Sequence, residues 1–411
     1  MDSSNGRQPE PGLTRFLTSL KLGERLPAAV TEGAFVRLNL TVIGTNVMQQ
    51  HNNDLTQAVL NANATADPWY SEVSVIDRNV PLSSALVFAG FDFEYQIKDL
   101  WTQDGQHSEH NRALFAVDLK DPNKQVELPK QLGSRYTVKG HQPSDVIEFF
   151  QQVQRSIPNL IWDRAGKVGN GEKLFALAKL PVDEMLINGG DRNADGSWAD
   201  REDTIKPYIG FTINVFGKSR IFAEATLPAC MNAYRSHFNG KRDSLDFSHS
   251  ASLDVERAVE AIKHFDGGVL LADANRLAQR MMNSNETQRY IKTVLLKHSS
   301  TLVQAKSTGV DTMLGNTEHL TEDQLNKFNR ILDQVNAQLT HGNGQRLASR
   351  YGTLWGAFNA ITGWLDHTRR TRAVSDKDGL SGTVAQHVDG VVSNIKKTAL
   401  HNALLLTGSQ S

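Results

Sequence analysis

The sequence predicts an α+β fold, in which a mostly antiparallel sheet with packed helices is followed by a helical C-terminal region. Apolar residues alternate over residues 209–215 and again over residues 221–227, on either side of a Gly-Lys-Ser turn at 217–219, which is typical of a β-hairpin. After Pro228 the apolar spacing becomes helical, and helix-capping patterns recur along the rest of the chain.

The composition is that of an ordinary globular protein of 411 residues. Hydrophobic residues make up 39% and charged residues 22% of the chain. Because 44 basic residues are balanced by 45 acidic ones, no overall field attracts nucleic acid, and any such partner must be held by local clusters of cations.

Cysteine usage and hydropathy indicate the compartment. The single cysteine, Cys230, excludes an internal disulfide and a cysteine-built zinc site. The N-terminus lacks a basic segment followed by an apolar run, and no apolar window reaches the roughly 18 residues that a membrane-spanning helix needs. We therefore expect a cytoplasmic protein with no membrane partner.

The chain is predicted to have four parts. Residues 1–80 are an N-terminal segment, partly flexible, with a strand over residues 35–42. Residues 81–300 are the α+β core. Residues 301–320 are a linker, because apolar residues are scarce there, and residues 321–411 are the helical C-terminal region.

Shorter elements fill the core. A helix ends at Gly90, and another begins at a cap over residues 142–145. Further strands are predicted over residues 91–97, 112–117, 135–138 and 173–180.

Helices dominate after the hairpin. Capping and apolar spacing predict them over residues 255–265, from a capping box at 285–288, from a second box at 321–324, and over residues 388–400.

The most informative helix lies within residues 351–372. One face carries an apolar stripe formed by Leu354, Phe358, Ile361 and Leu365. Another face carries a polar line formed by Asn359, Thr362, Asp366 and Arg370. The helix therefore combines a packing face with an ordered polar face that ends in a basic cluster.

Several separated stretches resemble the phage/plasmid-like proteins, a family whose shared domain has no known function. The resemblance covers about residues 83–405, and its most specific block combines Trp, Asn, Thr, Asp-His and Arg over residues 352–372. The chain departs from the family pattern after Cys230, where Asn-Ala-Tyr replaces Asn-Thr-Leu. The other matching blocks are residues 83–86, 91–95, 136–138, 174–180 and 229–232.

This resemblance implies a genetic context more than a chemistry. Proteins of this kind are carried by phages, plasmids and integrating elements, often near recombination and single-strand DNA genes, and they show a distant likeness to single-strand annealing proteins. The resemblance therefore implies DNA, in single-stranded form, as the partner, together with homo-oligomers and phage or host replication proteins.

Basic residues far apart in the sequence are the candidate nucleic-acid contacts. If folding gathers them, they form a groove for a phosphate backbone, with Tyr234, Phe238 and Tyr351 as stacking faces. The alternative is that they only complement helix dipoles and keep the surface soluble. The candidates are Arg235, Lys241, Arg242, Arg369, Arg370, Arg372, Lys396 and Lys397.

A catalytic interpretation of the helix is weaker than a structural one. Adjacent helical residues point about 100° apart, so Asp366 and His367 cannot pair within the helix. We favour a buried network in which Asp366 holds an arginine from elsewhere and Asn359 satisfies the hydrogen-bonding groups of a neighbouring strand or loop. Cys230, at the end of an apolar strand, is interpreted as a buried thiol. No residue is assigned a catalytic role.

One loop matches the pattern of a calcium-binding loop. Asp191, Asn193 and Asp195 occupy its first, third and fifth positions, Gly196 its sixth and Glu202 its twelfth. The flanks do not read as helices, so the prediction is at most an isolated structural calcium ion, and no other cofactor is expected.

These observations favour a non-enzymatic protein that binds DNA, single-stranded in our interpretation, during replication or recombination of a phage or plasmid. Two alternatives remain open. The first is a structural or regulatory protein-protein interaction factor of a mobile element. The second is a metal-dependent nuclease or hydrolase that uses the surroundings of Asp366 or the Asp191 loop.

Overall fold

The computed structural model confirms the α+β class. The chain divides into two units, residues 1–55 and 56–411, and every residue described below belongs to the second. The predicted strand over residues 35–42 lies outside the described residues. The structure describes residues 74–101, 103–133, 136–236, 244–248, 252–265, 267–305, 315–369, 386–388 and 390–408.

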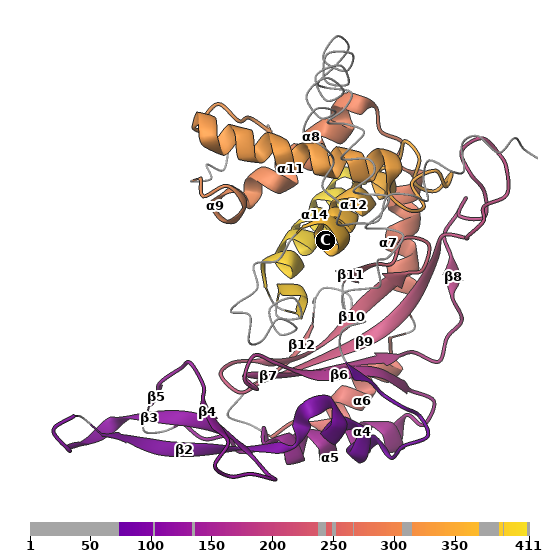
Figure 1. The fold of residues 1–411 in the computed structure, drawn as a ribbon. Coiled ribbons are helices and arrows are strands. Elements are labelled where there is room, and N and C mark those ends of the chain that lie inside the picture. The colour runs from indigo at the N-terminus through magenta and orange to yellow at the C-terminus, as the bar shows by residue number, and fades with distance from the viewer. Residues whose placement is uncertain are drawn as a thin grey trace, which may run out of the picture. The chain divides into compact units, whose positions relative to one another are not determined.

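The larger sheet has eight strands, and all of its pairings are antiparallel (Figure 1). Six strands follow the order β1-β6-β7-β9-β10-β11, while β8 pairs with β9 and β12 pairs with β10. The bounds are β1 Ser74–Val75, β6 Ile161–Val168, β7 Lys173–Lys179, β8 Met185–Leu186, β9 Thr204–Asn214, β10 Ser219–Leu227, β11 Asn232–Ser236 and β12 Leu245–Phe247.

A smaller sheet of four strands adjoins two helices and a π-helical turn. Helix α5 lies against β2, and its Phe149 and Phe150 pack onto Phe211 of the larger sheet. The bounds are β2 Phe93–Trp101, β3 His107–Asp118, β4 Gln125–Glu127, β5 Leu132–Gly133, α4 Leu82–Leu86, η2 Val87–Phe91 and α5 Pro143–Ser156.

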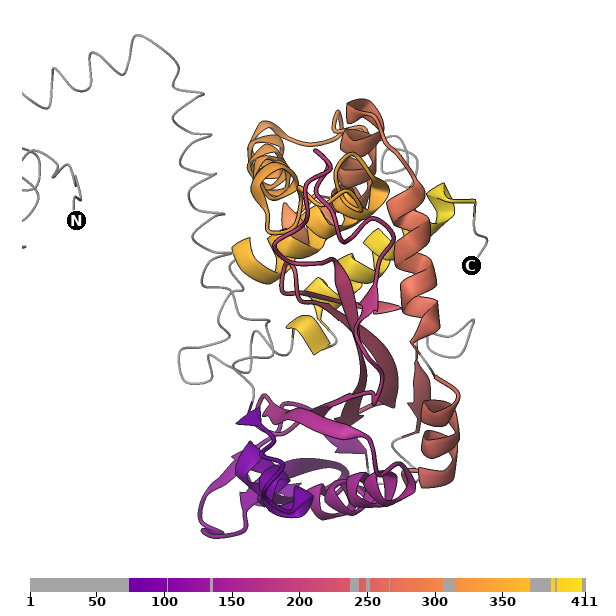
Figure 2. The ribbon, with the colours of Figure 1, turned by 90° about the vertical axis from the view of Figure 1, so that its right-hand side faces the viewer.

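The remaining described helices follow the sheets in sequence. In Figures 1 and 2, α4 and α5 lie at one end of the larger sheet and the orange-to-yellow C-terminal helices gather at the other. The bounds are α6 Val255–Lys263, α7 Gly268–Gln279, α8 Ser284–Lys297, α9 Ser299–Leu302, α11 Glu322–His341, α12 Leu354–Gly363, η3 Trp364–Thr368 and α14 Val391–Leu406. No described helix combines the length and apolarity needed to cross a membrane.

The predicted hairpin is confirmed as β9 and β10. Ile209 lies opposite Ala223 and Phe211 opposite Ile221, so the alternating residues of both strands share one face. On the other face Gly210 lies opposite Phe222, whose ring covers the glycine. Both strands are buried along almost their whole length, because helices pack on the sheet.

Replacing Gly210 by alanine is expected to destabilise the fold by about 1–3 kcal/mol, because overpacking a filled core forces side chains and backbone to shift. A Cβ atom at this position would lie 2.1 Å from Cε2 of Phe222, which is 1% exposed. Urea denaturation measures the loss. Gly133→Ala is the matched control, since no atom lies within 4 Å of the Cβ position there. Equal stability of the two variants would contradict the packing.

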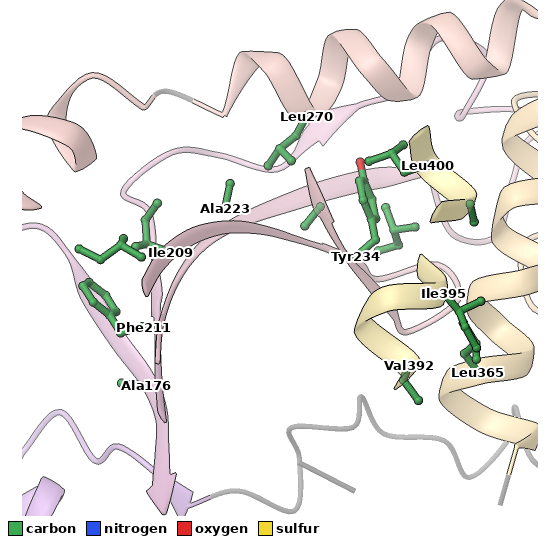
Figure 3. Packing of buried hydrophobic residues seen from close by; sticks show 14 of the residues in the cluster. Ala176, Ile209, Phe211, Ala223, Tyr234, Leu270, Leu365, Val392, Ile395 and Leu400 are labelled. Carbon is green, nitrogen blue, oxygen red and sulfur yellow. The ribbon is translucent and has the colours of Figure 1, made fainter. Parts of the chain in front are cut away.

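One apolar core joins the sheet to the C-terminal helices (Figure 3). It runs from Ile209 and Phe211 in the sheet to Ile395 and Leu400 in α14. Helix α12 packs against α7, α8, α11, α14 and β11. All of its residues are buried, so the predicted apolar stripe is correct, but Asn359 and Thr362 of the polar line beside it are buried as well.

Local signals located most helix starts. The capping box at Thr321 and Gln324 and the cap at Gln142 are confirmed, whereas the box expected at 285–288 forms earlier, between Asn283 and Glu286. The strand expected over residues 135–138 is wrong for residues 136–138, which have no strand structure.

Candidate functional site

Strand β11 places a polar network between the sheet and α12. The side-chain amide of Asn232 donates to the backbone oxygen of Asn359 at 3.2 Å and to the hydroxyl of Thr362 at 3.0 Å. The backbone N–H of Ala233 donates to Oδ2 of Asp366 at 3.1 Å. Asn359, Thr362 and Asp366 of the polar line therefore accept hydrogen bonds from a neighbouring strand. The spacing of these residues predicted such a network.

Five titratable side chains meet beside this network, and we call them the ionic centre: Glu224, Arg235, Asp366, His387 and Lys396. Nζ of Lys396 lies 2.5 Å from Oδ1 of Asp366 and donates to the backbone oxygen of Ala233. The cation on Asp366 is thus a lysine from α14 rather than the predicted arginine.

The second ion pair of the centre crosses two strands. Glu224 and Arg235 are directly opposite each other in β10 and β11, and Nε of Arg235 lies 3.4 Å from Oε2 of Glu224. The guanidinium also lies over the ring of Phe222, 3.4 Å from its centroid. Cation–π contact and ion pairing together hold Arg235 against the sheet.

Burial governs the titration of the centre. Desolvation raises the pKa of Glu224, and the nearby Arg235 and Lys396 oppose this rise. Desolvation lowers the pKa of His387 well below its usual value, and the field of Lys396 and Arg235 lowers it further. His387 is therefore neutral at pH 7, and it shares the centre with two acidic and two basic side chains. The centre encloses a cavity of only about 10 Å³, too small for an organic ligand.

This geometry changes the role of two predicted DNA contacts. Arg235 is 8% exposed and Lys396 is 6% exposed, and each has a carboxylate partner. Their charges therefore face the interior rather than a phosphate backbone. Tyr234, a predicted stacking residue, is also buried, whereas Tyr351 is exposed.

The other candidates divide into two groups. Arg369 is half-buried, its Nη1 has no hydrogen-bond partner among the described residues, and burial lowers its pKa. Lys397 is partly exposed on α14. The remaining candidates, together with Phe238, lie outside the described residues: Lys241, Arg242, Arg370 and Arg372.

Lys397 contributes to a cavity of about 230 Å³, which we call the basic cavity. Lys297 from the end of α8 and His401 from α14 line it as well, and both are exposed. Ser236 lines it at the end of β11, immediately before the segment that carries Lys241 and Arg242. Arg235 belongs to both the basic cavity and the ionic centre.

The pKa of a neighbouring histidine, His298, is affected by cations near this cavity. Nε2 of His298 lies 2.9 Å from the hydroxyl of Thr398, which lines the cavity. Burial lowers the pKa of His298, and the positive charges of Lys297 and Arg369 lower it further. Lys297 and Arg369 therefore both lie near enough to His298 to act on its titration.

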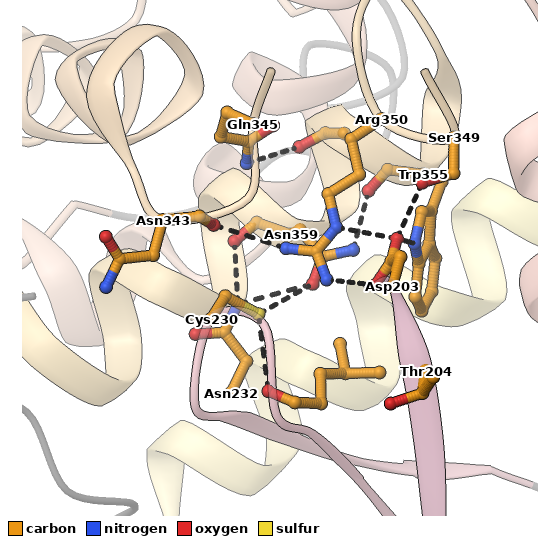
Figure 4. Close-up of polar contacts among 12 residues, drawn as sticks. Asp203, Thr204, Cys230, Asn232, Asn343, Gln345, Ser349, Arg350, Trp355 and Asn359 are labelled. Atoms are coloured by element: carbon orange, nitrogen blue, oxygen red, sulfur yellow. Dashed lines mark hydrogen bonds and ion pairs between the residues drawn. The ribbon is translucent and has the colours of Figure 1, made fainter. Parts of the chain in front are cut away.

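A second polar network lies next to the first, near Cys230 and the start of β11 (Figure 4). Asp203 accepts hydrogen bonds from Nε of Arg350 at 2.8 Å, from Nε1 of Trp355 at 3.0 Å and from the hydroxyl of Ser349 at 2.7 Å. It also pairs with Nη2 of Arg350. Both charged side chains are fully buried, so this pair fixes the loop before α12 to the start of β9.

Cys230 is the buried thiol that its position predicted. Burial raises the pKa of its thiol, which excludes a thiolate at neutral pH. Nε2 of His367 lies 3.0 Å from the backbone oxygen of Cys230 and 3.0 Å from Oδ1 of Asn232. Asp366 instead binds Lys396, so the two adjacent helical residues serve different partners.

The predicted calcium loop is closed by its own hydrogen bonds. Oδ1 of Asp195 accepts from the backbone N–H and the hydroxyl of Ser197, and the amide of Asn193 donates to Ser197 and to the backbone oxygen of Trp198. Across residues 74–408, gaps excepted, no group of three or more His, Cys, Asp or Glu side chains could hold a metal ion. Calcium binding by Asp191, Asn193, Asp195 and Glu202 stays a prediction.

The fold and site define an α+β protein with a buried ionic centre next to a basic cavity. The chain belongs to the family described as domain of unknown function DUF932, which matches residues 130–381, more than half of its length. That region includes the larger sheet from β6 onward and helices α5 to α12. No curated protein and no solved structure shows significant similarity to the chain.

Proposed function

We propose that the protein binds single-stranded DNA, without catalysing a reaction on it, at the basic cavity. One observation carries this proposal: Lys297, Lys397 and His401 line a single recess together with Ser236 at the end of β11. Cations gathered from separate parts of a nearly neutral chain make a local phosphate-binding surface.

The shape of the cavity favours a flexible strand over a duplex. Lys297 comes from α8, while Lys397 and His401 come from α14, so the cations lie in a recess between two helices. A single strand can bend into such a recess, whereas a duplex presents a convex, stiff surface. The resemblance to phage/plasmid-like proteins supports a role for this binding in replication or recombination of a mobile element, with annealing as its proposed outcome.

Replacing both Lys297 and Lys397 by glutamine is expected to weaken binding to a labelled oligothymidylate about tenfold. Each lost phosphate contact also lowers the magnitude of the slope of log Kobs against log salt by about 0.7, so two contacts lower it by about 1.4. Fluorescence anisotropy over a salt series measures both quantities.

Lys263→Gln is the control for net charge, because Lys263 is exposed on α6, away from the basic cavity. Lys263→Gln should leave the affinity for oligothymidylate and the salt slope unchanged. Circular dichroism checks that the double variant is folded. Unchanged affinity and slope in the folded double variant would refute the proposal.

A further inference from the structure

A larger polar cavity, of about 680 Å³, lies between two loops that the proposed function does not use. One wall is the 191–202 loop and the other is the 341–347 stretch after α11. Ala194 N–H donates to the backbone oxygen of Arg346 at 2.8 Å, and Ala348 N–H donates to that of Arg192 at 2.8 Å. The walls are thus tied together, and the volume is that of a small-molecule site.

The charge of this polar cavity favours an anion. Arg201 and Arg346 line it, both are exposed, and neither forms an ion pair with a described residue. His341 also lines it, and Asp200 is the one acidic residue among the described residues that line it. The C-terminal carbonyls of α11 add partial negative charge, and the carboxylate of Asp195 interacts with Arg346. Among the described residues that line the cavity, two guanidinium groups face one carboxylate.

An exposed indole lies in the same loop as Arg201, three residues before it. Trp198 is 68% exposed, and its backbone oxygen accepts a hydrogen bond at 3.2 Å from Asn193, which lines the polar cavity. The guanidinium of Arg192 lies 4.0 Å from the centroid of the indole ring. An exposed, cation-backed indole is a stacking platform for a nucleobase.

We propose that this polar cavity binds a nucleotide, with Arg201 and Arg346 on the phosphate and Trp198 on the base. Guanidinium groups hold phosphate oxygens through paired N–H donors, and the indole supplies the sequence-tolerant part of the affinity. The residues differ from those of the basic cavity, so this proposal stands or falls independently of single-stranded DNA binding there.

Isothermal titration calorimetry of the full chain with adenosine monophosphate, inorganic phosphate and adenosine tests the proposal. We expect binding of the monophosphate that is about tenfold weaker in the Arg201→Gln/Arg346→Gln variant. Trp198→Ala should weaken binding of the monophosphate but not of phosphate. Arg155→Gln, an exposed arginine on α5, is the control and should bind as the unaltered chain does.

Two outcomes overturn the proposal: no binding of the monophosphate by the unaltered chain, or equal binding by the folded double-arginine variant. Competition with a short oligothymidylate distinguishes a site for free nucleotides from a site for nucleotides within a strand. We expect the oligothymidylate to displace the monophosphate only if the site accepts a nucleotide within a strand. The Lys297→Gln/Lys397→Gln variant should keep its affinity for the monophosphate, which separates failure here from failure at the basic cavity.

Discussion

Replacing Asp203 by asparagine is expected to lower the free energy of unfolding by about 3–5 kcal/mol, the cost of leaving one member of a buried ion pair without its partner. Asp203 and Arg350 are both fully buried, and the carboxylate also accepts hydrogen bonds from Ser349 and Trp355. Asparagine keeps the shape of the side chain but leaves the guanidinium charge uncompensated. Urea denaturation followed by tryptophan fluorescence measures the loss.

Two further variants separate charge from shape. Asp200→Asn removes a carboxylate from an exposed position three residues earlier and should change stability by less than about 0.5 kcal/mol. Adding Arg350→Met to Asp203→Asn removes the orphaned cation and should restore part of the loss. If the double variant is no more stable than Asp203→Asn, the buried charge is not the cause.

Replacing Lys396 by methionine is expected to cost a similar 3–5 kcal/mol. The substitution keeps the apolar stem but removes the cation 2.5 Å from the buried Asp366 and the hydrogen bond to Ala233. Differential scanning calorimetry and urea denaturation measure the change. Single-stranded DNA binding of the folded fraction should be preserved, since the charge of Lys396 faces the interior.

The adjacent lysine is the natural control for this substitution. Lys397 lines the basic cavity and is partly exposed, so Lys397→Met should cost less than about 1 kcal/mol of stability and act on DNA binding instead. Equal, small stability losses for both lysines would contradict the described partner of Asp366.

Local patterns were enough to predict the fold class. Alternating apolar residues on both sides of a Gly-Lys-Ser turn predicted the β9–β10 hairpin. A capping box formed by Thr321 and Gln324 predicted the start of α11. The spacing of Asn359, Thr362 and Asp366 likewise predicted a polar network against a neighbouring strand or loop, because residues three, four or seven apart share one face of a helix. Each of these signals lies within one hairpin or one helix.

The burial of the cations could not be predicted in this way. Strand β11 has only five residues, Asn232–Ser236, and all are buried, so it shows no alternation. Arg235 is neutralised because the register of β10 and β11 sets it opposite Glu224, and Lys396 reaches Asp366 only through the packing of α14. These are pairings between distant parts of the chain, which no local pattern encodes.

The role of Lys297 in the basic cavity could not be predicted from a local pattern either. Lys297 ends α8 and reads in the sequence as an ordinary basic residue in a last helical turn. Only its position beside α14 makes it a partner of Lys397 and His401. Spatial convergence, rather than residue type, distinguishes a ligand-binding lysine from one that only complements a helix end.

The pairing of Lys396 with Asp366 also sets the order in which this protein can mature. Helix α14 is the last described element of the chain, yet it supplies the counterion for a carboxylate at the heart of the domain. Lys396 is synthesised 30 residues after Asp366, so the nascent chain must keep the carboxylate hydrated until α14 has emerged. The interior around Asp366 can therefore be completed only after the synthesis of α14.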